Sequence, residues 1–418
     1  MKILLLTFGF FPEKGGIPHT INSMCKYFKY KEHTLIILNP NYKGENIHKL
    51  LNKTYSFKKL LKIGLKKSFP RGLITIFKSL LKDRKISLFE RINFIMFLLS
   101  KPPTLIKTIN NFQRIYPFLR STDFDVIVTS DSGNLLILGV ILSKLFNKKL
   151  VALAHGLDFL IKSYFSLKYF YFKNTDMFIL SNNWLKNMFQ KIYNISDEKI
   201  DIINRGMFFE TYHIEESKEI LRKKYNIPNN QFVLLSVGRH TWRKNFQLVI
   251  KAIKKIKDIE PNINLKYYLV GKGEYTPELK ILVRKLGLID DIKFLGILEN
   301  NIRNEFYKLS DLFLMPSISK KNDIEGFGIV FLEANYYKVP VIGSASGGIV
   351  EAISDGENGF LVKPNNLDDL VEKIITLYHN KDLCIQMGEI GYKRVLKDYD
   401  WKKIGEQYEK TFKKVINL

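Results

Sequence analysis

The sequence contains only two cysteines among its 418 residues. Cys25 and Cys384 lie far apart, and neither has a second cysteine nearby. This pattern excludes a disulfide-stapled scaffold and a zinc site built on paired cysteines. Such cysteine usage is typical of a protein that works in a reducing cytosol.

Long apolar runs are also missing, although hydrophobic residues make up 46% of the chain. A helix that crosses a bilayer needs about 20 consecutive apolar residues. The run 92–99 is too short, and the run 135–146 is interrupted by Lys144. We therefore expect no membrane-spanning helix. The first residues are typical of a strand followed by a glycine-rich turn rather than of a signal peptide.

Acidic residues are few: the chain has 41 Asp and Glu and 66 Lys and Arg. Its formal net charge is therefore +25. This excess predicts attraction to nucleic acid, to an anionic membrane or to a phosphorylated substrate. The charge is concentrated in residues 43–117, where 17 basic and three acidic residues leave an excess of 14. Apolar residues recur there at roughly helical spacing, which predicts basic amphipathic helices that either bind an anionic leaflet or pack on their own sheet.

Strand-length apolar runs alternate with helix-length periodic segments along almost the whole chain. This alternation predicts an α/β protein with two Rossmann-like, doubly wound domains that face each other across a cleft. We expect domains at 1–212 and 231–395, a linker at 213–230 and a C-terminal helix within 396–418 that packs back on the first domain. The expected strands are 2–7, 33–38, 125–129, 150–154, 177–181, 200–203, 232–237, 265–270, 292–295, 312–315, 341–343 and 359–362.

Ligands of such sheets bind at the carboxyl ends of the strands. Gly15 and Gly16 follow the first strand and precede a helix, where exposed backbone N–H groups can meet a phosphate or a sugar. Neither a Gly-x-Gly-x-x-Gly fingerprint nor a Walker lysine motif occurs there, which argues against NAD and ATP. We expect no cofactor.

The second half carries a stronger signal for a diphosphate. Gly238 and Arg239 end a strand, and Arg243 and Lys244 open the next helix, so that two or three cations point at one strand end. Further along, Glu325 and Glu333 stand eight residues apart around a glycine-rich turn.

This turn predicts a cradle for a nucleoside diphosphate. Gly326 and Gly328 let the backbone approach a ligand, and the N–H groups of residues 328–330 can hold a phosphate. Glu333 can then reach the ribose hydroxyls.

The string EGFGIV, with its second glutamate eight residues after the first, resembles the Glu-x7-Glu motif of the retaining glycosyltransferases of family 4, which have the B-type fold. The strings VGRHTWRKNFQLVIKAI, YLVGKGEYTPELK and VPVIGSASGGIVEAISDGENGFLV follow in family-like order. The resemblance covers residues 231–412, and more loosely 1–40 and 125–206. It implies transfer of a sugar from a nucleotide donor with retention of anomeric configuration and without a bound metal.

The resemblance also implies roles for individual residues. Arg239 and Lys244 match the basic pair on the donor diphosphate, and Glu333 matches the ribose-binding glutamate. Glu325 matches the glutamate that lies against the donor sugar, and His155 matches the histidine that faces this sugar. Gly347, Gly348 and Glu351 match a second glycine loop. The catalytic residues are thus expected to be Glu325, His155, Arg239 and Lys244, and the donor-binding residues Gly15, Gly16, Gly238, Arg239, Lys244, Gly326, Phe327, Gly328, Ile329, Val330 and Glu333.

Two departures from the family pattern lie on the acceptor side. Residues 205–208 are Arg-Gly-Met-Phe where many relatives carry Asn-Gly-Val-Asp, and residues 130–132 are Ser-Asp-Ser where some carry histidines. Residues 123–125 match the Asp-x-Asp pattern of metal-dependent transferases, but they lead directly into a strand. We interpret them as a turn and expect no metal.

These observations lead to one main hypothesis and two alternatives. The main hypothesis is a cytoplasmic retaining glycosyltransferase, peripheral on the inner membrane face, that uses a nucleotide-sugar, with UDP as the expected nucleotide. It would build cell-surface polysaccharide on a glycan or lipid-linked acceptor. The first alternative is a soluble transferase with a small cytosolic acceptor. The second is a basic nucleic-acid-binding protein, which is disfavoured because the chain lacks a reader module and aromatic stacking platforms.

Overall fold

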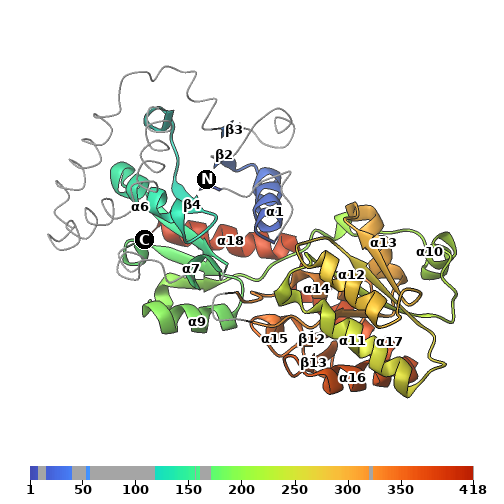
Figure 1. The fold of residues 1–418 in the computed structure, drawn as a ribbon. Helices are drawn as coiled ribbons and strands as arrows, with labels where there is room; N and C mark the ends of the chain where they lie inside the picture. The colour runs from blue at the N-terminus through green and yellow to red at the C-terminus, as the bar shows by residue number, and fades with distance from the viewer. Residues whose placement is uncertain are drawn as a thin grey trace. The chain divides into compact units, whose positions relative to one another are not determined.

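The computed structural model describes residues 1–7, 16–39, 53–56, 118–155, 157–160, 171–319 and 323–417. The chain folds as two units: Met1–Gly206 with Trp401–Leu418, and Met207–Asp400 (Figure 1). Gly15 lies outside the described residues, as does the basic segment 43–117 apart from its residues 53–56.

The first unit is built on a parallel sheet whose central strands are apolar and fully buried. Its described strands follow the order β3-β2-β1-β4-β5-β6-β7. They are β1 (Lys2–Leu6), β2 (Thr34–Asn39), β3 (Lys53–Ser56), β4 (Val126–Thr129), β5 (Lys149–Ala154), β6 (Met177–Leu180) and β7 (Ile200–Ile202). The described helices include α1 (Gly16–Tyr30), α6 (Asn134–Phe146), α7 (Leu157–Leu160) and α9 (Asn183–Tyr193).

The last helix of the chain, α18 (Trp401–Ile416), belongs to this first unit. Figure 1 shows it in red beside the blue helix α1. The rings of Phe28 and Phe412 stack with centroids 5.4 Å apart. Tyr27 donates a hydrogen bond to Glu409 (3.1 Å), and Gly405 leaves room for the Tyr27 ring, since a Cβ there would lie 2.2 Å from it. The packing of α18 thus depends on a glycine opposite an aromatic ring.

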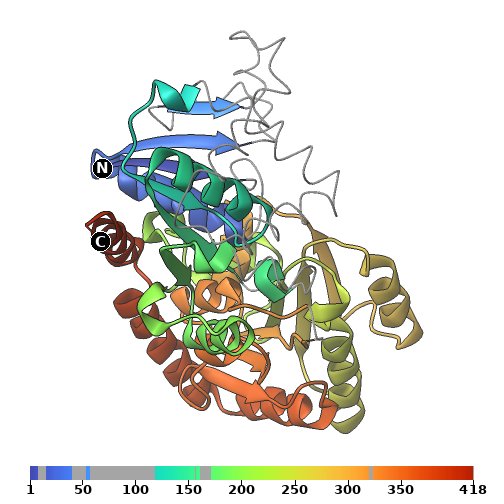
Figure 2. The ribbon, with the colours of Figure 1, turned by 90° about the vertical axis from the view of Figure 1, so that its left-hand side faces the viewer.

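The second unit holds a parallel sheet in the order β10-β9-β8-β11-β12-β13, and Figure 2 shows its orange strands among helices. The strands are β8 (Phe232–Val237), β9 (Leu265–Val270), β10 (Ile292–Gly296), β11 (Leu312–Met315), β12 (Val341–Ser344) and β13 (Gly359–Val362). The helices are α10 (Lys218–Lys224), α11 (Phe246–Ile259), α12 (Thr276–Lys285), α13 (Asn300–Leu309), α14 (Ile329–Tyr336), α15 (Ile349–Ala352), α16 (Leu367–His379) and α17 (Lys381–Asp398).

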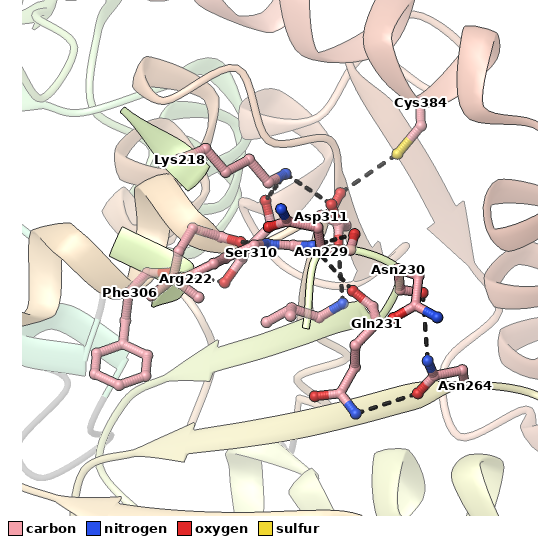
Figure 3. A network of polar contacts seen from close by, with 12 residues as sticks. Lys218, Arg222, Asn229, Asn230, Gln231, Asn264, Phe306, Ser310, Asp311 and Cys384 are labelled. Atoms are coloured by element: carbon pink, nitrogen blue, oxygen red, sulfur yellow. Dashed lines mark hydrogen bonds and ion pairs between the residues drawn. The ribbon is translucent and has the colours of Figure 1, made fainter. Parts of the chain in front are cut away.

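A buried ion network fastens α10 to this second unit (Figure 3). Arg222, 4% exposed, donates to Asp311 (2.5 Å) and to three backbone carbonyls. Asp311 also accepts from Lys218 (2.7 Å) and from the Val233 N–H (2.7 Å). Residues 213–230, expected as a linker, therefore lie within the unit 207–400.

The expected doubly wound α/β fold is confirmed: both sheets are parallel with crossover order, and each expected strand lies within a residue or two of an observed one. Strand β3 was not expected, because its four residues, Lys-Thr-Tyr-Ser, lack an apolar run. Among the helices of the described part of the chain, none is both long and apolar enough to cross a membrane.

Candidate active site

The loop that follows strand β8 carries the basic residues expected at the diphosphate. Residues 242–244 form a short 3-10 turn, and Asn245, at φ 52°, leads into α11. Arg239 is exposed. Lys244 is 12% exposed, and its Nζ lies 3.1 Å from the Met315 sulfur at the end of β11. The two predicted diphosphate ligands therefore differ, one open to solvent and the other enclosed.

Glu325 binds two cations of this loop. Its Oε2 accepts from Lys244 Nζ (2.5 Å) and from Arg243, which also pairs with Asp323 (2.9 Å). Burial would raise the pKa of Glu325, but Lys244 and Arg243 outweigh it and hold the pKa at about 2. Burial lowers the pKa of Lys244, and Glu325 opposes that shift. Arg243, which the sequence places among the cations of this loop, is thus the second cation on Glu325. The contact of Arg239 and Lys244 with a donor diphosphate stays a prediction.

The glycine turn after Glu325 opens helix α14. Gly328 has φ 87°, and a Cβ there would lie 2.7 Å from the Phe331 ring. Phe327 is buried beneath the turn, with its ring 5.9 Å from that of Tyr399. The first N–H groups of a helix have no acceptor within it, so those of residues 328–330 are the ones offered to an anion.

The second glycine loop lies directly on Glu325. The Gly348 N–H donates to the Glu325 carbonyl (2.8 Å). Gly347, at φ 62°, passes so close that a Cβ would lie 2.5 Å from the same carbonyl oxygen. The structure thus joins Lys244, Glu325, the glycine turn and the second glycine loop into one site of the second unit.

Glu333, the second glutamate of the motif, has different neighbours. It is 5% exposed and accepts from the hydroxyls of Tyr212 (3.1 Å) and Tyr307 (2.8 Å). Arg303 lies 3.5 Å from its Oε1. Burial and the charge of Glu333 raise the pKa values of both tyrosines, which keeps their hydroxyls protonated as donors. Sequence reasoning missed Tyr212, Tyr307 and Arg303 as partners. They lie 121, 26 and 30 positions before Glu333 in the sequence, and no local motif marks them.

In the first unit, His155 follows β5 and is joined to the loop after β4. Its Nε2 lies 3.0 Å from the Ser130 carbonyl oxygen. Burial and Arg205 lower the pKa of His155 against the opposing charge of Asp158, so the ring is neutral at pH 7. Asp158 accepts from the His155 N–H (3.0 Å) and from Ser132, through its N–H (2.9 Å) and hydroxyl (2.7 Å). Gly16, also predicted as a ligand, begins α1.

Asp123 and Asp125 occupy the turn before β4. Asp123 pairs with Lys2 (2.8 Å), and Asp125 accepts from the Lys2 N–H (2.7 Å). Within the described ranges, no group of three or more His, Cys, Asp or Glu residues could hold a metal ion.

Comparison with known proteins identifies the family. The model described as "Glycosyl transferases group 1" matches residues 217–394, and the one described as "Glycosyltransferase Family 4" matches residues 14–208. The chain belongs to glycosyltransferase family 4. The resemblance stated from the EGFGIV motif is thereby confirmed.

Relatives of this glycosyltransferase include an uncharacterized glycosyltransferase of Methanocaldococcus jannaschii, 30% identical over 73% of this chain and 79% of the relative. The N-acetyl-alpha-D-glucosaminyl L-malate synthase of Bacillus anthracis is 30% identical over 54% of each chain. Two further curated relatives are matched over 59% and 50% of their own length. The structure of Anabaena HepE in complex with UDP and glucose matches with a TM-score of 0.72, at 18% identity over 99% of this chain and 100% of HepE, which shows a shared fold.

Proposed function

We propose that this protein is a metal-independent, retaining glycosyltransferase that moves a sugar from a nucleotide-sugar, with UDP as the expected nucleotide. The observation that carries the proposal is the enclosed ion cluster of Lys244, Arg243 and Glu325 directly before the glycine turn of α14. Cations, helix N–H groups and a carboxylate at one strand end suit a sugar diphosphate.

The chemistry follows from where charge develops. As the bond between the anomeric carbon and the diphosphate breaks, negative charge grows on the departing phosphate oxygen. Lys244, Arg239 and the N–H groups of residues 328–330 stabilise that charge. The acceptor oxygen bonds to the anomeric carbon on the face that the phosphate leaves, and the departing phosphate takes the acceptor's proton. Glu325 lies against the donor sugar, and Glu333 binds the ribose. His155, whose ring is neutral at pH 7, is the further catalytic residue of this proposal.

Lys244 has two competing partners in this scheme. In the structure Glu325 lies 2.5 Å from the Lys244 ammonium group and neutralises its charge. An arriving diphosphate brings a second anion to the same ammonium group. Glu325 remains ionised, because its pKa of about 2 lies far below neutral pH. A carboxylate rather than a carboxylic acid therefore faces the sugar.

A donor panel tests the proposal. Hydrolysis and transfer are measured for UDP-, GDP- and ADP-sugars, with and without EDTA, and the anomeric configuration of the fresh product is followed by NMR. We expect turnover of a UDP-sugar that survives EDTA and gives a retained anomer. No turnover of any nucleotide-sugar, or an inverted anomer, contradicts the proposal. Activity lost in EDTA and restored by Mg²⁺ or Mn²⁺ would reassign Asp123 and Asp125 to a metal.

For the acceptor, we propose a glycan or lipid-linked molecule of cell-surface polysaccharide biosynthesis, reached from the cytoplasm at the inner membrane face. The basic segment 43–117 supports this proposal through its excess of 14 positive charges. A small cytosolic acceptor is the second candidate. It is favoured by the Bacillus relative, whose name describes the synthesis of N-acetyl-α-D-glucosaminyl L-malate.

A further inference from the structure

The second unit begins with a connecting segment, residues 207–214, that directly follows Gly206, where the chain leaves the first unit. Side chains of α13, of α14 and of the residue after α14 hold its backbone carbonyls. The bonds run from Tyr336 to Phe209 (3.3 Å), from Asn304 to Thr211 (3.1 Å), from Tyr337 to Tyr212, and from Lys308 to Ile214 (2.7 Å). The connecting segment is therefore fixed to the two helices that also carry Glu333 and Tyr307.

One side chain of the connecting segment reaches the motif itself. The Tyr212 ring is buried, with 3% of the residue exposed, and its hydroxyl donates to Glu333 Oε1 (3.1 Å). Tyr307 donates to Oε2 (2.8 Å), so each carboxylate oxygen is held by a different tyrosine. Arg303 adds a positive charge 3.5 Å from Oε1. These donors fix the plane of the carboxylate.

The carboxylate still has room for a ligand. An ionised carboxylate has about four lone-pair positions, and two hydroxyls and one guanidinium take up at most three of them. A ribose hydroxyl can therefore donate to Glu333 without displacing a tyrosine. It would meet an acceptor already oriented, which saves the cost of ordering that side chain on binding.

We propose that Tyr212 is a positioning residue for ribose recognition: its hydroxyl holds Glu333 in the orientation that accepts from the ribose. This inference rests on the proposed function, which assigns the ribose to Glu333. It makes the connecting segment part of the nucleotide site.

The test compares ribose discrimination in the full-length protein and two variants. Calorimetry measures the affinity of UDP and of 2′,3′-dideoxy-UDP for the wild type, Tyr212→Phe and Tyr337→Phe. Tyr337→Phe is the matched control, because it removes a hydroxyl that binds the Tyr212 carbonyl and leaves the Glu333 contacts in place. Thermal unfolding of each variant reports any loss of stability.

The wild type should bind UDP at least about tenfold more tightly than the dideoxy analogue, because a hydrogen bond to a charged group is worth about that much. In Tyr212→Phe this ratio should fall to about threefold or less, through weaker UDP binding and unchanged analogue binding. Tyr337→Phe should lower the melting temperature and keep the wild-type ratio. If Tyr212→Phe does not fold, Tyr307→Phe, which frees the other oxygen, should lower the ratio in the same way.

Each other outcome has a defined meaning. A wild-type ratio that persists in Tyr212→Phe overturns the positioning role and leaves the proposed function standing. Equal wild-type affinities for the two nucleotides overturn the ribose assignment of Glu333 and the role of Tyr212 with it. An equal loss of the ratio in Tyr337→Phe shows that general loosening of the segment is responsible and also overturns the proposal.

Discussion

Asp131 is a carboxyl group whose environment opposes its ionisation. Burial and the charge of Asp158 raise its pKa to about 6, although the N–H groups of Gly133 and Leu135 oppose the shift. In the unfolded chain the same group titrates near 3.8. As pH rises between these two values, the unfolded state loses its proton first. Ionisation of Asp131 therefore removes stability across this window.

The variant Asp131→Asn should show this dependence directly. Asparagine can still accept from the Gly133 N–H but does not ionise. Its stability relative to the wild type should rise between pH 4 and pH 6 by about 2 to 3 kcal/mol and then stay level. Urea unfolding at pH 4 and pH 7.5 measures the change, and the exposed Glu357→Gln is the control for loss of one negative charge. A stability difference that is the same at both pH values contradicts the account.

At the scale of elements, the strands were predictable because buried parallel strands are nearly continuous apolar runs. The place of α10 was not predictable. It depends on Arg222 and Asp311, which lie 89 positions apart. In the candidate site, glycine spacing and the charges of Lys244 and Glu325 indicated a diphosphate. Sequence spacing alone gave no sign that Arg243 would bind Glu325, because these two residues lie 82 positions apart.

The buried part of the ion network around Asp311 should contribute far more to the free energy of unfolding than its solvent-exposed part. Asp311→Ala leaves the buried guanidinium of Arg222 without its carboxylate and should cost about 3 to 5 kcal/mol of unfolding free energy. Lys218, whose side chain is 36% exposed, contributes a partly solvated pair to the same carboxylate. Lys218→Ala should therefore cost at most about 1 kcal/mol. Denaturant unfolding measures the free energy of unfolding of both variants. A similar decrease in the two variants would show that the buried pair of Arg222 and Asp311 is not what anchors α10.

At the scale of the whole molecule, the charge is unevenly distributed. The excess of 14 in residues 43–117 accounts for more than half of the net +25. Each basic residue near an anionic leaflet contributes about 1 kcal/mol of binding free energy, within a Debye length of about 10 Å at moderate salt. Residues 43–117 therefore carry the proposal that the enzyme works at a membrane surface.

Vesicle flotation tests the location. The protein should float with phosphatidylglycerol-rich vesicles and much less with neutral ones. Added salt should weaken the binding. Some binding should persist at high salt, because the apolar side chains between the lysines also contact the membrane. The charge-reversed variant should stay in solution; it carries Lys58→Glu, Lys59→Glu, Lys62→Glu, Lys66→Glu and Lys67→Glu. Equal flotation of both proteins, or none by either, would favour the small cytosolic acceptor.

The most direct test of the central claim is the turnover of Glu325→Ala and Lys244→Ala with the best nucleotide-sugar of the panel. Each variant removes a group that the proposed function places at the reacting centre, so each should lower turnover at least about a hundredfold while the protein stays folded. Lys254→Ala, which removes only an exposed ion pair within α11, should turn over as the wild type does. Near-normal turnover in a folded Glu325→Ala or Lys244→Ala variant would contradict the assignment of the active site.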